Sequence, residues 1–223
     1  MSNTVNILST KTLLQKQKQQ LLDKNFSVAE KDFIAIKNIS FELLLVNDNL
    51  IFSSQNAVES VLQHSKWETL KTKTVFCVGL KTKAILEESG FNVAAYSEYA
   101  ADLAEIITLV YGTKNFTFFC GTIRRDELPN ALNKHKITCN EIVVYETHLK
   151  THKVEHKINA LLFFSPSAVN SYLESNTITN ETCFCIGTTT AKALENRTKN
   201  IVIASQPTVE NVINEVIKFY KRF

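Results

Sequence analysis

The amino-acid sequence repeats itself at a spacing close to half of its 223 residues. Three pairs of segments match at shifts of 108 to 111 positions: residues 54–58 with 165–169, 76–87 with 184–195, and 21–36 with 131–146. Matches at nearly one shift, in the same order along the chain, indicate a duplicated structural unit. The sequence therefore predicts two similar lobes of about equal size.

Short apolar runs rich in Val, Ile and Phe alternate with segments in which apolar residues lie three and four positions apart. This alternation is typical of an α/β protein, in which a parallel sheet carries helices on both faces. Strands are expected near residues 5–8, 33–36, 41–46, 50–53, 75–78, 116–120, 142–145, 161–164, 183–186 and 201–204. Helices are expected within residues 55–62, 82–89, 101–111, 126–135, 168–175, 190–196 and 208–220.

Two polar segments interrupt this pattern, at residues 37–41 and 147–158, and we interpret both as linkers. Two linkers imply that the chain leaves one lobe, builds the other and then returns. The first lobe is expected to comprise residues 1–36 and 158–223, and the second residues 41–146. The predicted fold class is α/β, with two similar doubly wound parallel-sheet lobes.

The composition is that of an ordinary soluble protein, with 44% apolar and 21% charged residues. Its 25 basic and 22 acidic side chains are well mixed, which argues against a dedicated nucleic-acid binder. The N-terminus lacks the pattern of a signal peptide, and no apolar run is long enough to span a bilayer. We expect a cytoplasmic protein that contacts no membrane.

No residue pattern calls for a metal. The five cysteines are odd in number and lack paired CxxC spacing, so we expect buried free thiols. The three histidines His148, His152 and His156 are spaced by four and would line one helical face as possible ligands. Their segment has little apolar periodicity, which favours a solvated linker.

The clearest candidates for function are two serine-bearing turns that follow repeated strands. Ser54 and Asn56 begin one helix, and Ser165 and Ser167 begin the matching helix. These oxygens can cap the helices, for about 1 kcal/mol each. Alternatively, because ligands of open parallel sheets bind at the carboxyl ends of strands, two lobes carrying such turns can face each other across a cleft.

A second repeated element places a glycine after a strand and a threonine three residues later. Gly79 precedes Thr82 in one lobe, and Gly187 precedes Thr190 in the other. Backbone N–H groups and the helix dipole at such a terminus attract carboxylate or phosphate, at about 0.3 to 1 kcal/mol per contact. The chain has neither GxGxxG nor GxxxxGK[ST], which argues against a dinucleotide or a P-loop nucleotide.

Two further strand ends carry groups suited to chemistry. In FFCGTIRRDEL, Gly121 ends a strand and Arg125 precedes a helix, where its guanidinium suits carboxylate binding or pairs with a neighbouring acid. In VVYETH, Tyr145 ends another strand. A phenol, with an ordinary pKa near 10, stays protonated at neutral pH and can donate a proton to a leaving hydroxyl. The residues alone favour the other interpretation, an aromatic anchor packed at the lobe junction.

These segments together resemble the uroporphyrinogen-III synthase family over nearly the whole chain. The resemblance rests on the ordered motifs IFSSQNAVESVL, CVGLKTKAILEESGF, CGTIRRDELPNAL, EIVVYET, FFSPSAV and CIGTTTAKALENRTKNIVIASQPTVENVINEV. It implies two α/β lobes joined by two strand-like linkers, with the first strand–helix–strand unit packed in the lobe of the C-terminal half.

The resemblance implies a lyase that dehydrates and cyclises hydroxymethylbilane, a linear tetrapyrrole, with inversion of its terminal pyrrole ring. It implies no metal and no organic cofactor. We expect a monomer that has transient contact with the upstream deaminase. Two other functions fit the same turns: a non-enzymatic binding module for an anionic metabolite, and a sugar-phosphate isomerase.

Carried over by position, Tyr145 matches the family tyrosine proposed to assist loss of the hydroxyl. The expected substrate-binding residues are Ser54, Asn56, Thr82, Gly121, Arg125, Ser165, Ser167, Thr189 and Thr190. The first strand departs from the family pattern, because its turn reads ILSTKTL with only Lys11 as a basic residue. Binding by this N-terminal turn is therefore not expected.

Overall fold

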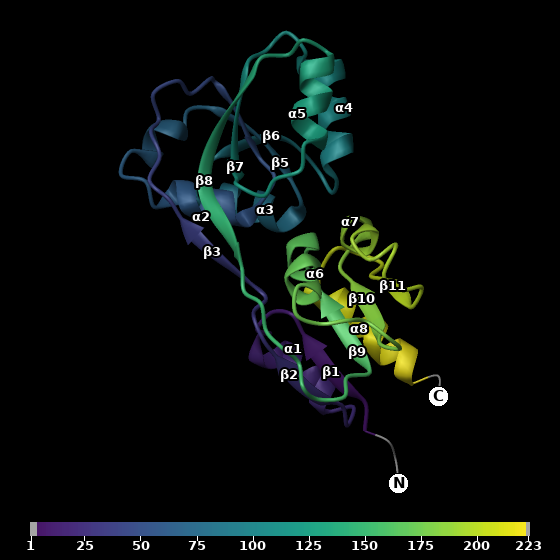
Figure 1. The fold of residues 1–223 in the computed structure, drawn as a ribbon. Helices are drawn as coiled ribbons and strands as arrows, with labels where there is room; N and C mark the ends of the chain where they lie inside the picture. The colour runs from purple at the N-terminus through teal and green to yellow at the C-terminus, as the bar shows by residue number, and fades with distance from the viewer. Residues whose placement is uncertain (1–3, 222–223) are drawn as a thin grey trace. The chain divides into compact units, whose positions relative to one another are not determined.

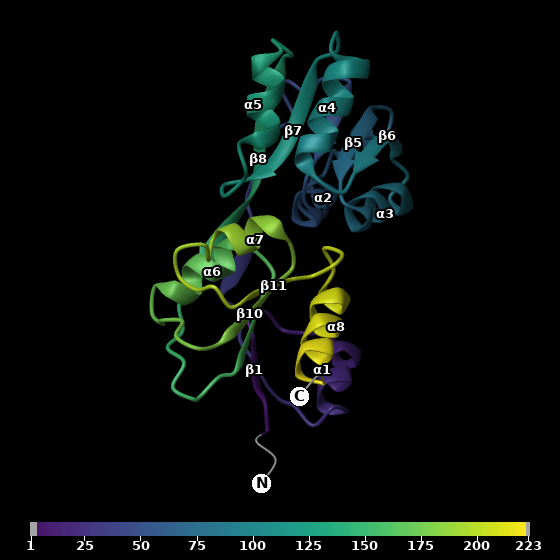
Figure 2. The same cartoon turned by 90° about the vertical axis from the view of Figure 1, so that its right-hand side faces the viewer.

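The computed structural model of the chain describes residues 4–221. They form two compact units (Figures 1 and 2). Unit 1 contains the residues up to Ala35 and those from His148 onward, and unit 2 contains Ile36–Thr147. The two chain crossings fall within strands β3 (Ile34–Asn38) and β8 (Cys139–Leu149).

Unit 1 is built on a parallel sheet of five strands in the order β11-β10-β9-β1-β2. Its strands are β1 (Asn6–Ser9), β2 (Ser27–Glu30), β9 (Ala160–Phe163), β10 (Thr182–Cys185) and β11 (Ile201–Ile203). Its helices are α1 (Gln15–Leu22), α6 (Pro166–Leu173), α7 (Thr188–Lys192) and α8 (Val209–Tyr220).

Unit 2 is built on a six-stranded sheet in the order β3-β8-β7-β4-β5-β6. Besides β3 and β8, its strands are β4 (Asn49–Phe52), β5 (Thr74–Val78), β6 (Asn92–Ser97) and β7 (Phe116–Gly121). Its helices are α2 (Gln55–Leu62), α3 (Leu80–Glu88), α4 (Ala100–Tyr111) and α5 (Glu127–Lys134), with a 3₁₀ turn, η1 (Trp67–Leu70). The pairs from β6 to β8 are all parallel.

The two sheets have the same strand order when the strands of unit 1 are counted from β9 instead of from β1. If β9, β10, β11, β1 and β2 are matched to β4, β5, β6, β7 and β8, both sheets read third-second-first-fourth-fifth. The three repeated segment pairs of the sequence fall on matching elements in this comparison. The predicted α/β fold with two similar parallel-sheet lobes is therefore confirmed.

Alternating side chains divide each sheet into two apolar faces. In β4, Leu50 and Phe52 pack with α2 and α3, whereas Ile51 packs with α4 and α5. In β9, Leu161 joins the core under α6 and α7, and Leu162 joins the core under α1 and α8. Helices thus cover both faces, as continuous apolar strands require.

Some predicted elements were wrong or missed. Residues 41–46 form no strand: Leu44 and Leu45 are 81% and 82% exposed, in an irregular segment. Strands β2 and β6 were missed, since SVAE and NVAAYS lack a strong apolar run. Helix α1 was missed because it buries only Gln17 and Leu21.

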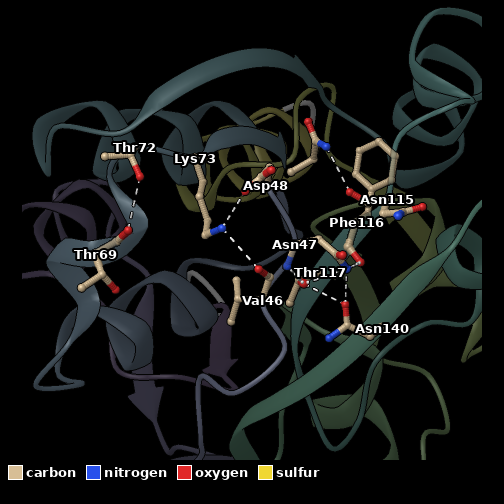
Figure 3. Close-up of polar contacts among 11 residues, drawn as sticks. Val46, Asn47, Asp48, Thr69, Thr72, Lys73, Asn115, Phe116, Thr117 and Asn140 are labelled. Atoms are coloured by element: carbon tan, nitrogen blue, oxygen red, sulfur yellow. Dashed lines mark hydrogen bonds and ion pairs between the residues drawn. The ribbon is translucent and has the colours of Figure 1, made fainter.

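The irregular segment before β4 is held to the sheet by a buried polar network (Figure 3). The Asn47 side chain donates to the Phe116 carbonyl and to Asn140 Oδ1, at 2.7 and 2.6 Å. The Thr117 hydroxyl, fully buried, accepts from the Asn47 backbone N–H at 2.8 Å and donates to Asn140 Oδ1 at 2.7 Å. These bonds pair groups that would otherwise cost about 1 to 3 kcal/mol each when buried.

No helix among residues 4–221 has the length and apolar character needed to cross a bilayer.

Candidate active site

The strand order of unit 2 reverses between β4 and β7, and this reversal fixes where polar groups can gather. The helix after β4, α2, packs on one face of the sheet, and the helix after β7, α5, packs on the other. Connections that leave in opposite directions open a crevice at the carboxyl ends of the two strands. The turns that begin at Ser53 and Gly121 lie at this place.

Tyr145 is brought to this place by a bulge in β8. Cys120 pairs with Val143, but the next residue of β7, Gly121, pairs with Tyr145. Val144 is the extra residue of the bulge. As a result, the side chains of Val144 and Tyr145 join the same core cluster, although consecutive residues of a regular strand point to opposite faces. The bulge is held in place by the Ser60 hydroxyl, which donates to the Val144 carbonyl. A bulge re-aims a side chain in this way.

The Tyr145 ring lies directly against the backbone of Gly121. A Cβ built on Gly121 would lie 2.4 Å from both Cε2 and Cζ of Tyr145, and 2.8 Å from its hydroxyl oxygen. Any side chain at this position therefore displaces the ring. Gly121 is the residue type that this close approach of the Tyr145 ring demands.

The Tyr145 phenol is 7% exposed and hydrogen bonded. Burial raises its pKa above the ordinary value of 10, and hydrogen bonds with the side chains of Ser54 and Asn56 offset part of that rise. The phenol is therefore protonated at neutral pH. Tyr145, Ser54, Asn56 and Gly121, all predicted as site residues, are brought together in unit 2.

Two of the three predicted serines, Ser54 and Ser165, cap helices. Ser54 accepts a hydrogen bond from the Asn56 backbone N–H at 3.2 Å, and Ser165 accepts one from the Ala168 N–H at 3.1 Å. Pro166 begins α6, where its missing N–H is not needed. The Ser54 side chain also lowers the pKa of the Tyr145 phenol, against the larger rise caused by burial. Ser167 is partly buried in the first turn of α6.

The glycine–threonine elements lie at the carboxyl ends of β5 and β10. Gly79 has a φ of 87°, which favours glycine, and its N–H donates to the Ser97 carbonyl at 2.7 Å. Thr82 and Thr190 are only 3% and 2% exposed, beneath their turns. Thr189 is more accessible. Burial favours a packing role for Thr82 and Thr190.

The two arginines after β7 have different roles. Arg124 forms ion pairs with Asp126 and Glu141. Arg125 is exposed, and it has no ion pair with any residue from 4 to 221. Of the two guanidinium groups, Arg125 is thus the one available to an anionic ligand.

The N-terminal turn of unit 1 is occupied by the protein's own carboxylates, which the sequence did not reveal. The backbone N–H groups of Thr12 and Leu13 donate to Asp32 and Glu30, at 2.7 and 2.8 Å. The buried Thr10 hydroxyl donates to the Leu162 carbonyl at 2.7 Å. This turn offers an external anion few free donors, in keeping with the departure noted in the sequence.

No group of three potential metal ligands occurs among residues 4–221. The His152 Nε2 atom lies 3.0 Å from the Asp32 carbonyl, and its ring meets Phe33 edge to face. Burial raises the pKa of both Cys183 and Cys185 to about 12, so these thiols are protonated at neutral pH.

The fold and site define a class: a two-unit α/β protein with hydroxyl-bearing turns at the carboxyl ends of parallel strands and a buried, protonated tyrosine. The family model described as "Uroporphyrinogen-III synthase HemD" matches residues 18–214. The chain belongs to this family.

Relatives and solved structures agree. The uroporphyrinogen-III synthase of Saccharomyces cerevisiae is 27% identical over 229 residues, covering 86% of this chain and 83% of the yeast protein. The Helicobacter pylori uroporphyrinogen-III synthetase structure has a TM-score of 0.72 at 22% identity, covering 97% of this chain and all of that one. A mutant Thermus thermophilus uroporphyrinogen III synthase has a TM-score of 0.71 at 14% identity, covering 99% and 100%. The two structures share the fold of this chain.

The contact between Gly121 and Tyr145 predicts an energetic coupling. Gly121→Ala should destabilise the protein by about 1 to 3 kcal/mol, because the new methyl group overlaps the Tyr145 ring. In the Tyr145→Ala background the same substitution should cost little, since the ring is gone. Urea unfolding of the four proteins in this double-mutant cycle measures the coupling.

Gly187→Ala is the matched control, because a Cβ on Gly187 meets no atom within 4 Å. It should leave the free energy of unfolding within about 0.5 kcal/mol of the parent. An equal cost for Gly121→Ala in both backgrounds would show that the tyrosine is not the constraint on this glycine.

Proposed function

We propose that this chain is a uroporphyrinogen-III synthase, a lyase that dehydrates and cyclises hydroxymethylbilane to uroporphyrinogen III with inversion of the terminal pyrrole ring. Membership of the family supports the proposal. The observation that carries it is the buried, protonated phenol of Tyr145 at the strand-order reversal of unit 2, oriented by Ser54 and Asn56.

In the proposed reaction Tyr145 assists loss of the substrate hydroxyl. The phenol donates its proton to the hydroxyl oxygen as the carbon–oxygen bond breaks, so that water leaves and an azafulvenium cation remains beside the phenolate. Because burial holds the phenol pKa high, the proton is present across the physiological pH range. The hydrogen bonds of Ser54 and Asn56 stabilise the phenolate that forms, until ring closure returns a proton.

The harder task is to choose which carbon of the terminal ring is attacked. Hydroxymethylbilane closes without inversion when it is free in solution, so the protein must orient the substituted carbon toward the azafulvene. Orientation of this kind supplies several kcal/mol of the barrier. It requires fixed contacts along a flexible substrate that carries eight carboxylates.

We propose that hydroxyl-bearing turns at the carboxyl ends of the strands hold these carboxylates. In unit 2 the available groups are the start of α2 and the exposed guanidinium of Arg125. In unit 1 they are the start of α6, with Ser165 and Ser167, and the accessible Thr189. Each contact contributes about 0.3 to 1 kcal/mol, and several together fix the register of the substrate. The buried side chains of Thr82 and Thr190 stabilise these turns by packing.

The proposal extends to the setting of the reaction. The chain acts as a monomer in the cytoplasm, without a metal or organic cofactor, and receives its unstable substrate through transient contact with the upstream deaminase. The absence of an electrostatic footprint for nucleic acid supports a small-molecule substrate.

Product isomer analysis tests the activity. With freshly made hydroxymethylbilane, the protein should give an excess of the type III isomer over the type I isomer after oxidation of the products. Type I product alone, at the rate of spontaneous closure, would contradict the proposal. Unchanged substrate held in a stable complex would instead indicate a binding module.

Tyr145→Phe tests the role of the phenol. Turnover should fall at least tenfold while KM changes less than threefold, because the ring still packs on Gly121 and only the proton donor is lost. For the wild type, kcat should show no loss from phenol ionisation below about pH 10, since the pKa of Tyr145 is raised. The control is Tyr99→Phe, an exposed tyrosine that precedes α4. Equal turnover of wild type and Tyr145→Phe would remove the chemical role of this hydroxyl.

A further inference from the structure

Unit 1 contains a groove that none of the predicted site residues lines. It runs beside the edge strand β2 and encloses about 760 Å³, which is within the usual range for small-molecule sites. Its walls are strands β1 and β2 on one side and the segment after β8 on the other. The lining residues are Asn6, Ile7, Leu8, Ser27, Ala29, Glu30, Lys31, Lys153, Val154, Glu155, His156, Lys157 and Ile158.

The outer wall of the groove is a preformed arch, residues 152–158. Asn176 holds one end, because its side chain donates to the His152 carbonyl at 2.7 Å and accepts from the Val154 N–H at 2.8 Å. Asn6 holds the other end by donating to the Lys157 carbonyl at 3.1 Å. The arch is thus tied down on both sides of the space that it bounds.

The matching face of unit 2 is filled. There the segment before β4 packs Phe41 and Val46 against the core, and Asn47 bonds it to β7 and β8 (Figure 3). In unit 1 the corresponding segment is the arch, residues 152–158. It contributes Val154 and Ile158 to the core, and the groove remains open between the arch and strands β1 and β2.

The chemistry of the groove suits an anion with an apolar body. Ala29, Val154 and Ile158 supply apolar surface, whereas Leu8 is only 2% exposed. Lys31 and Lys157 are exposed, and neither has an ion pair or hydrogen-bonded side-chain partner in the described part of the chain.

The remaining charged side chains of the lining do not cancel this preference. Lys153 donates to the Ser175 carbonyl. Glu30 is neutralised by its ion pair with Lys18. Glu155 is the one unpaired carboxylate against two unpaired ammonium groups, so the lining keeps a net positive charge.

The groove shares no lining residue with the proposed substrate site. It follows β2 from Ser27, at the amino end of that strand, to Lys31, just after its carboxyl end. The hydroxyl-bearing turns of unit 1 follow β9 and β10, and none of their residues lines the groove.

We propose that this groove is a second binding site, for a small organic anion whose apolar body rests on Ala29, Val154 and Ile158 and whose charge is attracted by the ammonium groups of Lys31 and Lys157. The ligand is amphipathic, since a small inorganic ion would leave the apolar wall uncovered. The site does not depend on the proposed enzymatic activity.

The fluorescent anion 1-anilinonaphthalene-8-sulfonate is a suitable probe, because it combines an aromatic body with one sulfonate. The full-length protein should bind it with a saturable fluorescence increase. Lys31→Glu with Lys157→Glu should weaken binding about tenfold by replacing attraction with repulsion. Ala29→Trp should weaken binding by filling the groove. Thermal melts show whether the variants remain folded, and the product isomer assay should be unchanged in each.

The matched control is Lys16→Glu with Lys24→Glu, which makes the same change of net charge on exposed positions outside the groove. Its affinity should stay within twofold of the wild type. The proposal is overturned if the probe shows no saturable binding, if the groove and control variants lose affinity equally, or if Arg125→Glu weakens binding while the groove variants do not.

Discussion

The reversal of strand order at the centre of each sheet is the constraint on which the rest of the structure depends. Where neighbouring parallel strands send their helices to opposite faces, the backbone leaves a crevice that no helix covers. In unit 2 this occurs between β4 and β7, and in unit 1 between β9 and β1. Duplicating the unit duplicates the crevice, which explains why the serine-bearing turn occurs twice in the chain.

The two crevices have diverged in what they contain. In unit 2 a bulge turns Tyr145 onto Gly121, and the Ser54 cap becomes a hydrogen-bond partner of the phenol. In unit 1 the Ser165 cap has no such partner, and the neighbouring turn is satisfied by Asp32 and Glu30. The candidate proton donor, Tyr145, therefore belongs to unit 2, while both units retain turns suited to binding carboxylates.

The sequence predicted the parts of the structure that depend on local pattern. Buried parallel strands are continuous apolar runs, and the repeat made the doubled fold visible. The missed elements bury little: β2 is an edge strand, and α1 is mostly glutamine and lysine. The false strand at residues 41–46 shows the opposite error, because Val46 packs inward while Leu44 and Leu45 face solvent.

The candidate site was predictable as a set of residues but not as an arrangement. Hydroxyls, glycines and a tyrosine at strand ends could be read from the repeat. The contact between the Tyr145 ring and Gly121 depends on a one-residue shift in the pairing of β7 with β8. No local sequence pattern specifies this shift. The burial of Thr82 and Thr190 depends likewise on how the turns pack.

Backbone amide chemical-shift mapping tests the central claim, that the hydroxyl-bearing turns at the carboxyl ends of the parallel strands bind a polyanionic tetrapyrrole. The ¹⁵N-labelled protein is titrated with uroporphyrinogen III under anaerobic conditions. We expect shifts at the amides of residues 54–57, 121–125, 165, 167 and 168. Shifts confined to the amino ends of the strands, such as those around Asn49 and Asn115, would contradict the claim.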